Sequence, residues 1–284
     1  MNISTTRHSI INRLTPAVGE REARAMADEI ILDVTGRNRL SIALNPDTPL
    51  EPESLSRIDS ICQRVIAGEP LQYVLGYAYF AGLKIMVTPA VLIPRPETAQ
   101  LVDMIVDNSD NISDLSVLDI CTGSGCIALA LARRLRFPHI TAVDISPDAL
   151  AVARDNADAL NLNATIGIQQ ADALNMPSSL SGPYDIIVSN PPYIARCERS
   201  DMDRRVLEHE PALALFVPDS DPLEFYRSIG KYAMEALAPG GTLYFEINPL
   251  FVEQLKKMLS TQGWTDVEII RDFTGRNRFA RCQR

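Results

Sequence analysis

The sequence predicts an α/β protein in which a small N-terminal helical bundle is joined by a β-hairpin to a domain with a mostly parallel sheet. Three observations support this prediction. Apolar residues in the first 76 positions recur at helical spacing, and two short apolar segments flank the Ala81-Gly82 pair, which favours a hairpin. From about residue 95 onward, short apolar runs alternate with helical patterns, which is typical of a parallel sheet covered on both faces.

Residues 1–76 are expected to form the helical domain. Asn45-Pro46 and Thr48-Pro49 separate its helices, and Gly68 ends the last of them. The bundle carries no obvious chemistry, so we interpret it as a substrate-recognition or docking domain. Two sets of apolar residues each lie on one helical stripe, the first being Ala23, Met26, Ala27, Ile30, Ile31 and Val34, and the second Leu55, Ile58, Cys62, Val65 and Ile66.

Residues 77–94 are expected to link the two domains. The aromatic residues at 77, 79 and 80 precede the Ala81-Gly82 turn, and the apolar run 83–87 follows it, which predicts a hairpin. Three prolines, at 89, 94 and 96, then stiffen the entry into residues 95–284.

Residues 95–284 are expected to form the α/β domain. Pro147 opens one of its helices, at the position that proline favours. Because ligands in such folds bind beyond the carboxyl ends of the strands, the residues that follow each strand are the candidates for chemistry. Strands are predicted at 116–119, 140–144, 165–169, 184–189, 242–247, 266–271 and 277–282, and helices at 127–135, 147–160, 223–237 and near 250–260.

Size and composition fit an ordinary globular protein, with 284 residues of which 46% are hydrophobic and 22% charged. No apolar run reaches the roughly 18 residues of a membrane span, and the N-terminus lacks a signal-peptide pattern, so we expect a cytoplasmic protein. The five cysteines are scattered and the three histidines lie far apart. Neither a disulfide framework nor a metal site is therefore expected.

The formal charge of −9 argues against broad nucleic-acid binding, which depends on clustered Lys and Arg. The last fourteen residues are an exception, since they contain only one acid, Asp272, among five arginines. We interpret them as a solvated final strand, and a basic edge that faces an RNA or an acidic partner is the alternative. The arginines are Arg271, Arg276, Arg278, Arg281 and Arg284.

A glycine turn follows the first predicted strand of the α/β domain. In the segment Asp119-Ile-Cys-Thr-Gly-Ser-Gly, Gly123 and Gly125 permit a tight turn and a close backbone approach, and the helix that follows offers free N–H groups. Asp144 closes the next strand, where a carboxylate can accept hydrogen bonds from both hydroxyls of a ribose. Asp172-Ala173 ends the third strand and can present a carboxylate and a backbone amide to an adenine edge.

The tetrapeptide Asn190-Pro191-Pro192-Tyr193 follows the apolar run 185–188. Two consecutive prolines stop the strand and fix the flanking carbonyls and the Asn190 amide in place, as a site for a flat amide or amine requires. By itself, the tetrapeptide is equally consistent with a turn that only ends the strand. Its position beside the glycine turn and the two strand-end acids favours an amide-handling site next to a nucleoside site.

These motifs resemble those of the class I S-adenosylmethionine-dependent methyltransferases, which have a Rossmann-like domain with a mostly parallel seven-stranded sheet. Asn-Pro-Pro-Tyr marks the members that methylate a planar nitrogen. From about residue 65 to the end, further segments resemble the peptide chain release factor N(5)-glutamine methyltransferases. They are Gly68-Glu-Pro-Leu-Gln-Tyr73, Phe80-Ala-Gly82, Pro94-Arg-Pro-Glu-Thr98, Glu210-Pro-Ala-Leu-Ala-Leu215 and Arg271-Asp-Phe-Thr-Gly-Arg276. Three residues depart from the family pattern, namely Cys121 and Asn248 where the family commonly has glycine, and Ala99 where it often has an acid.

The resemblance implies methyl transfer from S-adenosyl-L-methionine to the glutamine side chain in the Gly-Gly-Gln motif of class I release factors, without membrane or stable nucleic-acid binding. Asn190, Pro191 and Tyr193 are the implied catalytic residues, and with Pro192 they bind the substrate; Phe80 and Arg95 are weaker candidates for the pocket wall. The implied cofactor-binding residues are Cys121, Thr122, Gly123, Ser124, Gly125, Asp144, Asp172, Ala173 and Asn190.

Two alternatives stay open at this point. Adenine N6 also presents an NH2 group on a flat conjugated system, so a nucleic-acid methyltransferase could use the same tetrapeptide on a flipped base. Such an enzyme needs a basic face, and residues 1–76 contain 8 Arg and no Lys against 10 acids. The second alternative is a non-catalytic S-adenosylmethionine-binding protein, which would have no need of an intact Asn190-Pro-Pro-Tyr193.

Overall fold

The structure, a computed structural model, describes residues 1–284, which divide into two compact units. The first unit comprises Met1–Gly76 together with Asp203–His209, and the second comprises Tyr77–Met202 and Glu210–Arg284. None of the helices is long and apolar enough to cross a membrane. The assignment of separate roles to residues 1–76, 77–94 and 95–284 stays a prediction.

The first unit is entirely helical, and its apolar stripes form one core. Ile58, Cys62 and Val65 are buried as one stripe of α4, but Ile66 is 47% exposed and Ile61 is buried in its place. The prediction for Ile66 was wrong because the spacing of 3, 4 and 7 from Ile58 leads to 61, 62 and 65. The helices are α1 (Ile3–Val18), α2 (Glu20–Thr35), α3 (Arg39–Leu44), α4 (Pro52–Ile66), α5 (Leu71–Leu75) and α9 (Arg204–His209).

The segment that forms α9 lies far from the other helices of this unit in the sequence. Arg205 of α9 donates hydrogen bonds to both carboxylate oxygens of Glu22 on α2, with Nη1 2.6 Å from Oε1 and Nη2 3.2 Å from Oε2. Arg205 also pairs with Asp203, which lies just before the helix. This short helix therefore belongs to the N-terminal bundle.

The second unit is built on the predicted mostly parallel sheet of seven strands, in the order β10-β11-β9-β6-β3-β4-β5. Strands β9, β6, β3, β4 and β5 run parallel, whereas β11 is antiparallel to both β9 and β10. The sheet comprises β3 (Ser116–Ile120), β4 (His139–Asp144), β5 (Ile166–Gln170), β6 (Tyr184–Ser189), β9 (Leu237–Glu246), β10 (Thr265–Arg271) and β11 (Asn277–Gln283).

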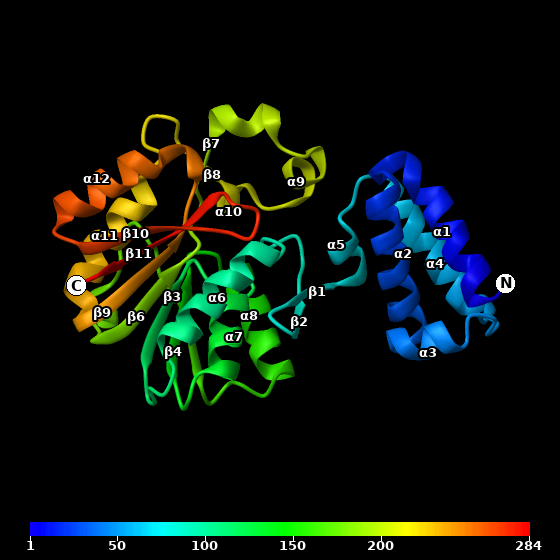
Figure 1. The fold of residues 1–284 in the computed structure, drawn as a ribbon, viewed down its shortest axis with the longest axis horizontal. Helices are drawn as coiled ribbons and strands as arrows, with labels where there is room; N and C mark the ends of the chain where they lie inside the picture. Colours follow the sequence, from blue (N-terminus) through cyan, green and yellow to red (C-terminus); the bar gives the residue numbers. More distant parts are fainter. The chain divides into compact units, whose positions relative to one another are not determined.

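Helices cover both faces of this sheet, with α6, α7 and α8 on one face and α11 and α12 on the other (Figure 1). The predicted hairpin forms, as β1 (Tyr77–Phe80) pairs antiparallel with β2 (Leu83–Met86). The helices are α6 (Pro96–Asn108), α7 (Cys126–Arg134), α8 (Pro147–Ala159), α10 (Ala212–Leu215), α11 (Glu224–Ala236) and α12 (Val252–Gln262), with short 3-10 turns at Ser178–Leu180, Arg196–Asp201 and Pro249–Phe251.

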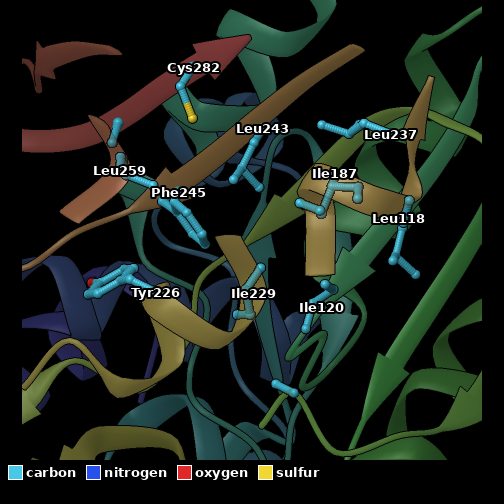
Figure 2. Packing of buried hydrophobic residues seen from close by; sticks show 14 of the residues in the cluster. Leu118, Ile120, Ile187, Tyr226, Ile229, Leu237, Leu243, Phe245, Leu259 and Cys282 are labelled. Carbon is cyan, nitrogen blue, oxygen red and sulfur yellow. The ribbon is translucent and has the colours of Figure 1, made fainter. Parts of the chain in front are cut away.

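The core between the sheet and helices α11 and α12 holds the central strands in place (Figure 2). Phe245 of β9 is fully buried and meets Tyr226 of α11 edge to face, with ring centroids 5.2 Å apart. Successive side chains of a strand point to opposite faces, so the residue after Phe245 points to the face that carries α6. That residue is Glu246, and its position there matters for the site described below.

Candidate active site

The loop after β3 has the backbone conformation that its glycines allow. Gly123 and Gly125 have φ of 55° and 80°, in the left-handed region that favours glycine. A Cβ at Gly125 would lie 3.2 Å from Cδ1 of Leu129 and 3.3 Å from Cβ of Ala153, so the absence of a side chain lets α7 and α8 approach. Cys121 also has a positive φ, 62°, which strains a residue with a side chain.

Asp119, near the end of β3, holds this loop in place through hydrogen bonds. Its Oδ2 accepts hydrogen bonds from the Thr122 hydroxyl at 2.6 Å and from the Ala128 N–H at 3.2 Å. The other oxygen, Oδ1, is buried without a hydrogen-bond partner. Because complete burial disfavours the charged form, the pKa of Asp119 is raised to about 7.

Asp144, at the end of β4, faces the same loop. Its Oδ2 accepts the Gly123 N–H at 2.9 Å and its Oδ1 accepts the Ser146 N–H at 3.0 Å. Burial raises the pKa of this carboxyl, and the two backbone hydrogen bonds oppose the shift. The carboxylate therefore has a fixed orientation at the carboxyl end of its strand.

A cavity of about 400 Å³ lies at the carboxyl ends of β3, β4, β5 and β6. It brings together most of the residues that the sequence analysis singled out, while Gly125, Pro191 and Tyr193 lie outside its lining, as does the buried Phe80. The predicted residues that do line it are Cys121, Thr122, Gly123, Ser124, Asp144, Asp172, Ala173, Asn190, Pro192 and Arg95.

These residues suit a nucleoside with a charged tail. The volume is that of a typical small-molecule site. At Gly123, which lines the cavity, no protein atom lies within 4 Å of where a Cβ would be, so the space beside the backbone is open to a ligand. The Asp144 carboxylate provides acceptors for hydroxyl groups. One carboxylate oxygen of Asp172 already has a partner within the protein, because Oδ1 accepts the Leu174 N–H at 2.9 Å. The donors and acceptors present fit S-adenosyl-L-methionine.

The Asn190-Pro-Pro-Tyr193 turn is held at both ends. The Ser189 hydroxyl donates to the Ile120 carbonyl at 2.6 Å, and Asn248 Nδ2 donates to the Tyr193 carbonyl at 3.0 Å. The Tyr193 hydroxyl donates to Oε1 of Glu246 at 3.1 Å. Burial, with the Glu246 carboxylate nearby, raises the pKa of Tyr193, so its hydroxyl keeps its proton and is no base.

Arg95 and Glu210 form a pair at the cavity wall. Arg95 Nη2 lies 2.5 Å from Oε1 of Glu210, whose side chain is 1% exposed, and Oε2 of Glu210 accepts the Ile93 N–H at 3.2 Å. Pro211, which lines the cavity, comes directly after Glu210, and Leu213 lines it from the same segment. The ion pair thus fixes the wall segment to the residues before α6.

Comparisons with known proteins identify the family. A family described as the PrmC N-terminal domain matches residues 7–76, and one described as a methyltransferase domain matches residues 117–209. The release factor glutamine methyltransferase of Bacteroides thetaiotaomicron is 42% identical over 93% of both chains, and that of Flavobacterium psychrophilum is 36% identical over 98% of both. The chain belongs to the release factor glutamine methyltransferase family.

Solved structures agree with the fold of this family. The hMettl16 catalytic domain, solved in complex with the MAT2A 3'UTR hairpin 6, superposes with a TM-score of 0.57 at 18% identity, covering 82% of this chain and 81% of that one. A methyltransferase from Pyrococcus furiosus gives 0.52 at 19% identity, covering 82% and 98%. These similarities show the class I methyltransferase fold.

Asn248 holds the turn through its side-chain amide. Asn248 is 4% exposed, and its Nδ2 donates both to the Tyr193 carbonyl and, at 2.8 Å, to Glu198. Cys121 has a backbone conformation that favours glycine.

Sequence reasoning missed the acidic residues behind the site. It gave no role to Glu246 or Glu210, and it named Thr98 only as part of a motif. The available signal was a carboxylate inside the apolar run 243–247, because a charged residue is seldom fully buried unless it is paired.

Proposed function

We propose that this enzyme transfers the methyl group of S-adenosyl-L-methionine to the side-chain nitrogen of the glutamine in the Gly-Gly-Gln motif of class I peptide chain release factors. The proposal rests on one observation, that Asn190 lines the same cavity as Gly123 and Asp144. A substrate glutamine amide bound at Asn190 would therefore lie beside S-adenosyl-L-methionine bound at the glycine loop. The curated relatives that match nearly the whole chain are named for this reaction.

The loop and strand ends would hold the cofactor. Asp144 would accept the two ribose hydroxyls, the backbone at Gly123 would approach the amino-acid part, and Asp172-Ala173 would face the adenine edge. Bound S-adenosyl-L-methionine supplies an electrophilic methyl group on a positively charged sulfur. The apolar walls of the cavity exclude water from that group.

The tetrapeptide would position the acceptor. An amide nitrogen is a weak nucleophile because its lone pair is delocalised, so it must be fixed in line with the methyl carbon. Asn190 Oδ1 and the Pro191 carbonyl would each accept one N–H of the glutamine amide. Positioning of this kind supplies roughly 7–11 kcal/mol. Tyr193, which lies outside the cavity lining, would hold the turn in place through its hydrogen bonds with Glu246 and Asn248.

No strong general base is required, because the nitrogen loses its proton only after it has attacked a cationic donor. This agrees with the surroundings of Tyr193, whose raised pKa keeps the hydroxyl protonated. Adenine N6 methylation is not favoured, since the curated relatives that cover most of the chain are named release factor glutamine methyltransferases. We expect no stable nucleic-acid binding and, because release factors work at the ribosome, a cytoplasmic location.

The test is a methylation assay with purified protein, labelled S-adenosyl-L-methionine and a class I release factor. We expect label on the wild-type release factor and none on a matched release factor whose motif glutamine is replaced by asparagine. DNA and RNA serve as competing acceptors in parallel reactions. Label on nucleic acid in place of the release factor would overturn the proposal.

A further inference from the structure

A buried chain of polar side chains runs from the cavity into the protein behind it. Asn190 Nδ2 lies 3.5 Å from Oγ1 of Thr98, on α6, and the Thr98 hydroxyl donates to Oε2 of Glu246, on β9, at 2.6 Å. Thr98 and Glu246 are each 2% exposed. Asn190 and Thr98 line the cavity, whereas Glu246 lies behind them.

The groups around Glu246 act on its pKa in opposite directions, and the net shift is upward. Burial raises the pKa of Glu246, and the neighbouring Glu97 adds to the rise. The Thr98 hydroxyl, the charge of Arg278 on β11 and the Tyr193 hydroxyl all lower it. Both carboxylate oxygens act as acceptors, since Oε2 accepts from the Thr98 hydroxyl at 2.6 Å and Oε1 from the Tyr193 hydroxyl at 3.1 Å.

The hydrogen bond from Thr98 to Glu246 gives the chain a direction. A threonine hydroxyl has one proton, and Thr98 donates it to Glu246, so its oxygen can only accept from Asn190. The group of Asn190 that faces Thr98 must then be the NH2, because two oxygens would repel one another. The carboxamide oxygen, Oδ1, is left on the side away from Thr98, free to accept an N–H in the cavity. The separation of 3.5 Å is long for a hydrogen bond, and hydrogen bonds in catalytic sites often shorten only when substrate binds.

We propose that Thr98 and Glu246 are positioning residues that fix the orientation of the Asn190 carboxamide, and so determine that the site presents an acceptor rather than a donor to the substrate nitrogen. This inference rests on the proposed function. It also explains why the site selects an NH2 group as its substrate. An Asn190 carboxamide turned the other way would present its own NH2 group to the NH2 of glutamine, and two donors cannot form a hydrogen bond.

The same carboxylate reaches the other end of the tetrapeptide. Glu246 Oε1 accepts from Tyr193 while Oε2 accepts from Thr98. One buried carboxyl group thus holds Tyr193 directly and Asn190 through Thr98, and these two residues flank the prolines. Arg278 is itself oriented by Asp272, with Nε 3.1 Å from Oδ2. Arg278, which the sequence analysis assigned to a solvated strand, thus lies near Glu246 and places a positive charge behind the site.

The first test separates the shape of the Thr98 side chain from its ability to form hydrogen bonds, with one variant for each. Thr98→Val keeps the shape but loses the hydroxyl, and Thr98→Ser keeps the hydroxyl but loses the methyl group. We expect Thr98→Val to lower kcat about 10- to 100-fold with KM and cofactor affinity within about two-fold, and Thr98→Ser to stay close to wild type. If Thr98 only fills space, the order of the two variants reverses, which overturns the proposal.

The second test exchanges the charge. In Glu246→Gln the new NH2 group can donate to Thr98, whose own proton then points toward Asn190. The Asn190 carboxamide is expected to turn so that Oδ1 accepts this proton and no longer faces the substrate. We expect a loss of kcat similar to that of Thr98→Val, and no further loss in the double variant, because both act through one chain. If the losses of kcat in the two single variants multiply in the double variant, the proposal is overturned.

The activity of wild-type enzyme distinguishes a failure of the proposed function from a failure of the positioning role. If it fails to methylate the release factor, the proposed function fails. If it methylates the release factor and Thr98→Val does so at the same rate, only the positioning role fails. Thermal unfolding of every variant shows whether the fold is kept, and the two Thr98 variants suffice should Glu246→Gln fail to fold.

Discussion

Replacement of Asp144 by asparagine tests how the cofactor site is built. The carboxylate accepts the N–H of Gly123 with one oxygen and that of Ser146 with the other. Asparagine offers one oxygen and one NH2 group, so one of these acceptor positions becomes a donor. The substitution also relieves the burial of a charge, so we expect the free energy of unfolding without cofactor to change by about 1 kcal/mol or less.

The effect on cofactor binding should be much larger. A hydrogen bond to a charged acceptor contributes roughly 1.5–3 kcal/mol, and asparagine loses one of the two that Asp144 can offer to ribose hydroxyls. We therefore expect Kd for S-adenosyl-L-methionine to rise about 10- to 100-fold, measured by isothermal titration calorimetry. Asp148→Asn is the matched control, because Asp148 lines the same cavity but is exposed, and its Kd should stay within about two-fold.

Two results would refute this reasoning. A Kd for Asp144→Asn within about two-fold of wild type would show that the carboxylate does not hold the cofactor. An equal loss in Asp148→Asn would show that net charge at the cavity, rather than hydrogen bonding by Asp144, determines affinity.

The other predictions concern stability. Asp119 has a pKa of about 7 in the folded protein against an ordinary 3.8, so the folded state holds its proton more tightly. The contribution of Asp119 to stability is therefore complete below pH 3.8 and is lost as pH rises toward 7. This loss amounts to roughly 4 kcal/mol in total, and urea unfolding across pH 4–8 should show it in the wild type and not in Asp119→Asn. Gly125→Ala should cost about 2–3 kcal/mol, because a positive φ adds to the crowding by Leu129 and Ala153, whereas Gly123→Ala, with no atom within 4 Å, should cost about 1 kcal/mol. Equal unfolding midpoints for the two alanine variants would contradict the role of close packing at Gly125.

The fold could be predicted because its signals are local. The strand-turn-helix order places the residues after β3, β4 and β6 at one edge, since the carboxyl ends of parallel strands meet there. The seven strands were each predicted to within a few residues, except that β9 begins at Leu237 rather than 242. Helix α6 was missed, although Leu101, Val102 and Ile105 lie on one buried stripe. The proline at its start, Pro96, was interpreted only as stiffening the entry into the domain.

The chain behind Asn190 could not be predicted. Thr98 and Glu246 are 148 positions apart, and only the packing of α6 on the face of β9 that carries Glu246 brings them together. The polar segment 194–217 was likewise left without structure, because its elements are too short for periodicity to reveal. One of them, α9, joins the N-terminal bundle through Arg205 and Glu22, which no local pattern indicates.

The central claim is that Asn190 positions a glutamine amide beside the cofactor, and it is tested most directly by mass spectrometry of release factor peptides after reaction. We expect wild-type enzyme to add one methyl group to the side chain of the motif glutamine, and Asn190→Ala to add none while its Kd for S-adenosyl-L-methionine stays within about ten-fold, since Asp144 and the glycine loop are unchanged. A methyl group on any other residue, or undiminished methylation by Asn190→Ala, would contradict the account.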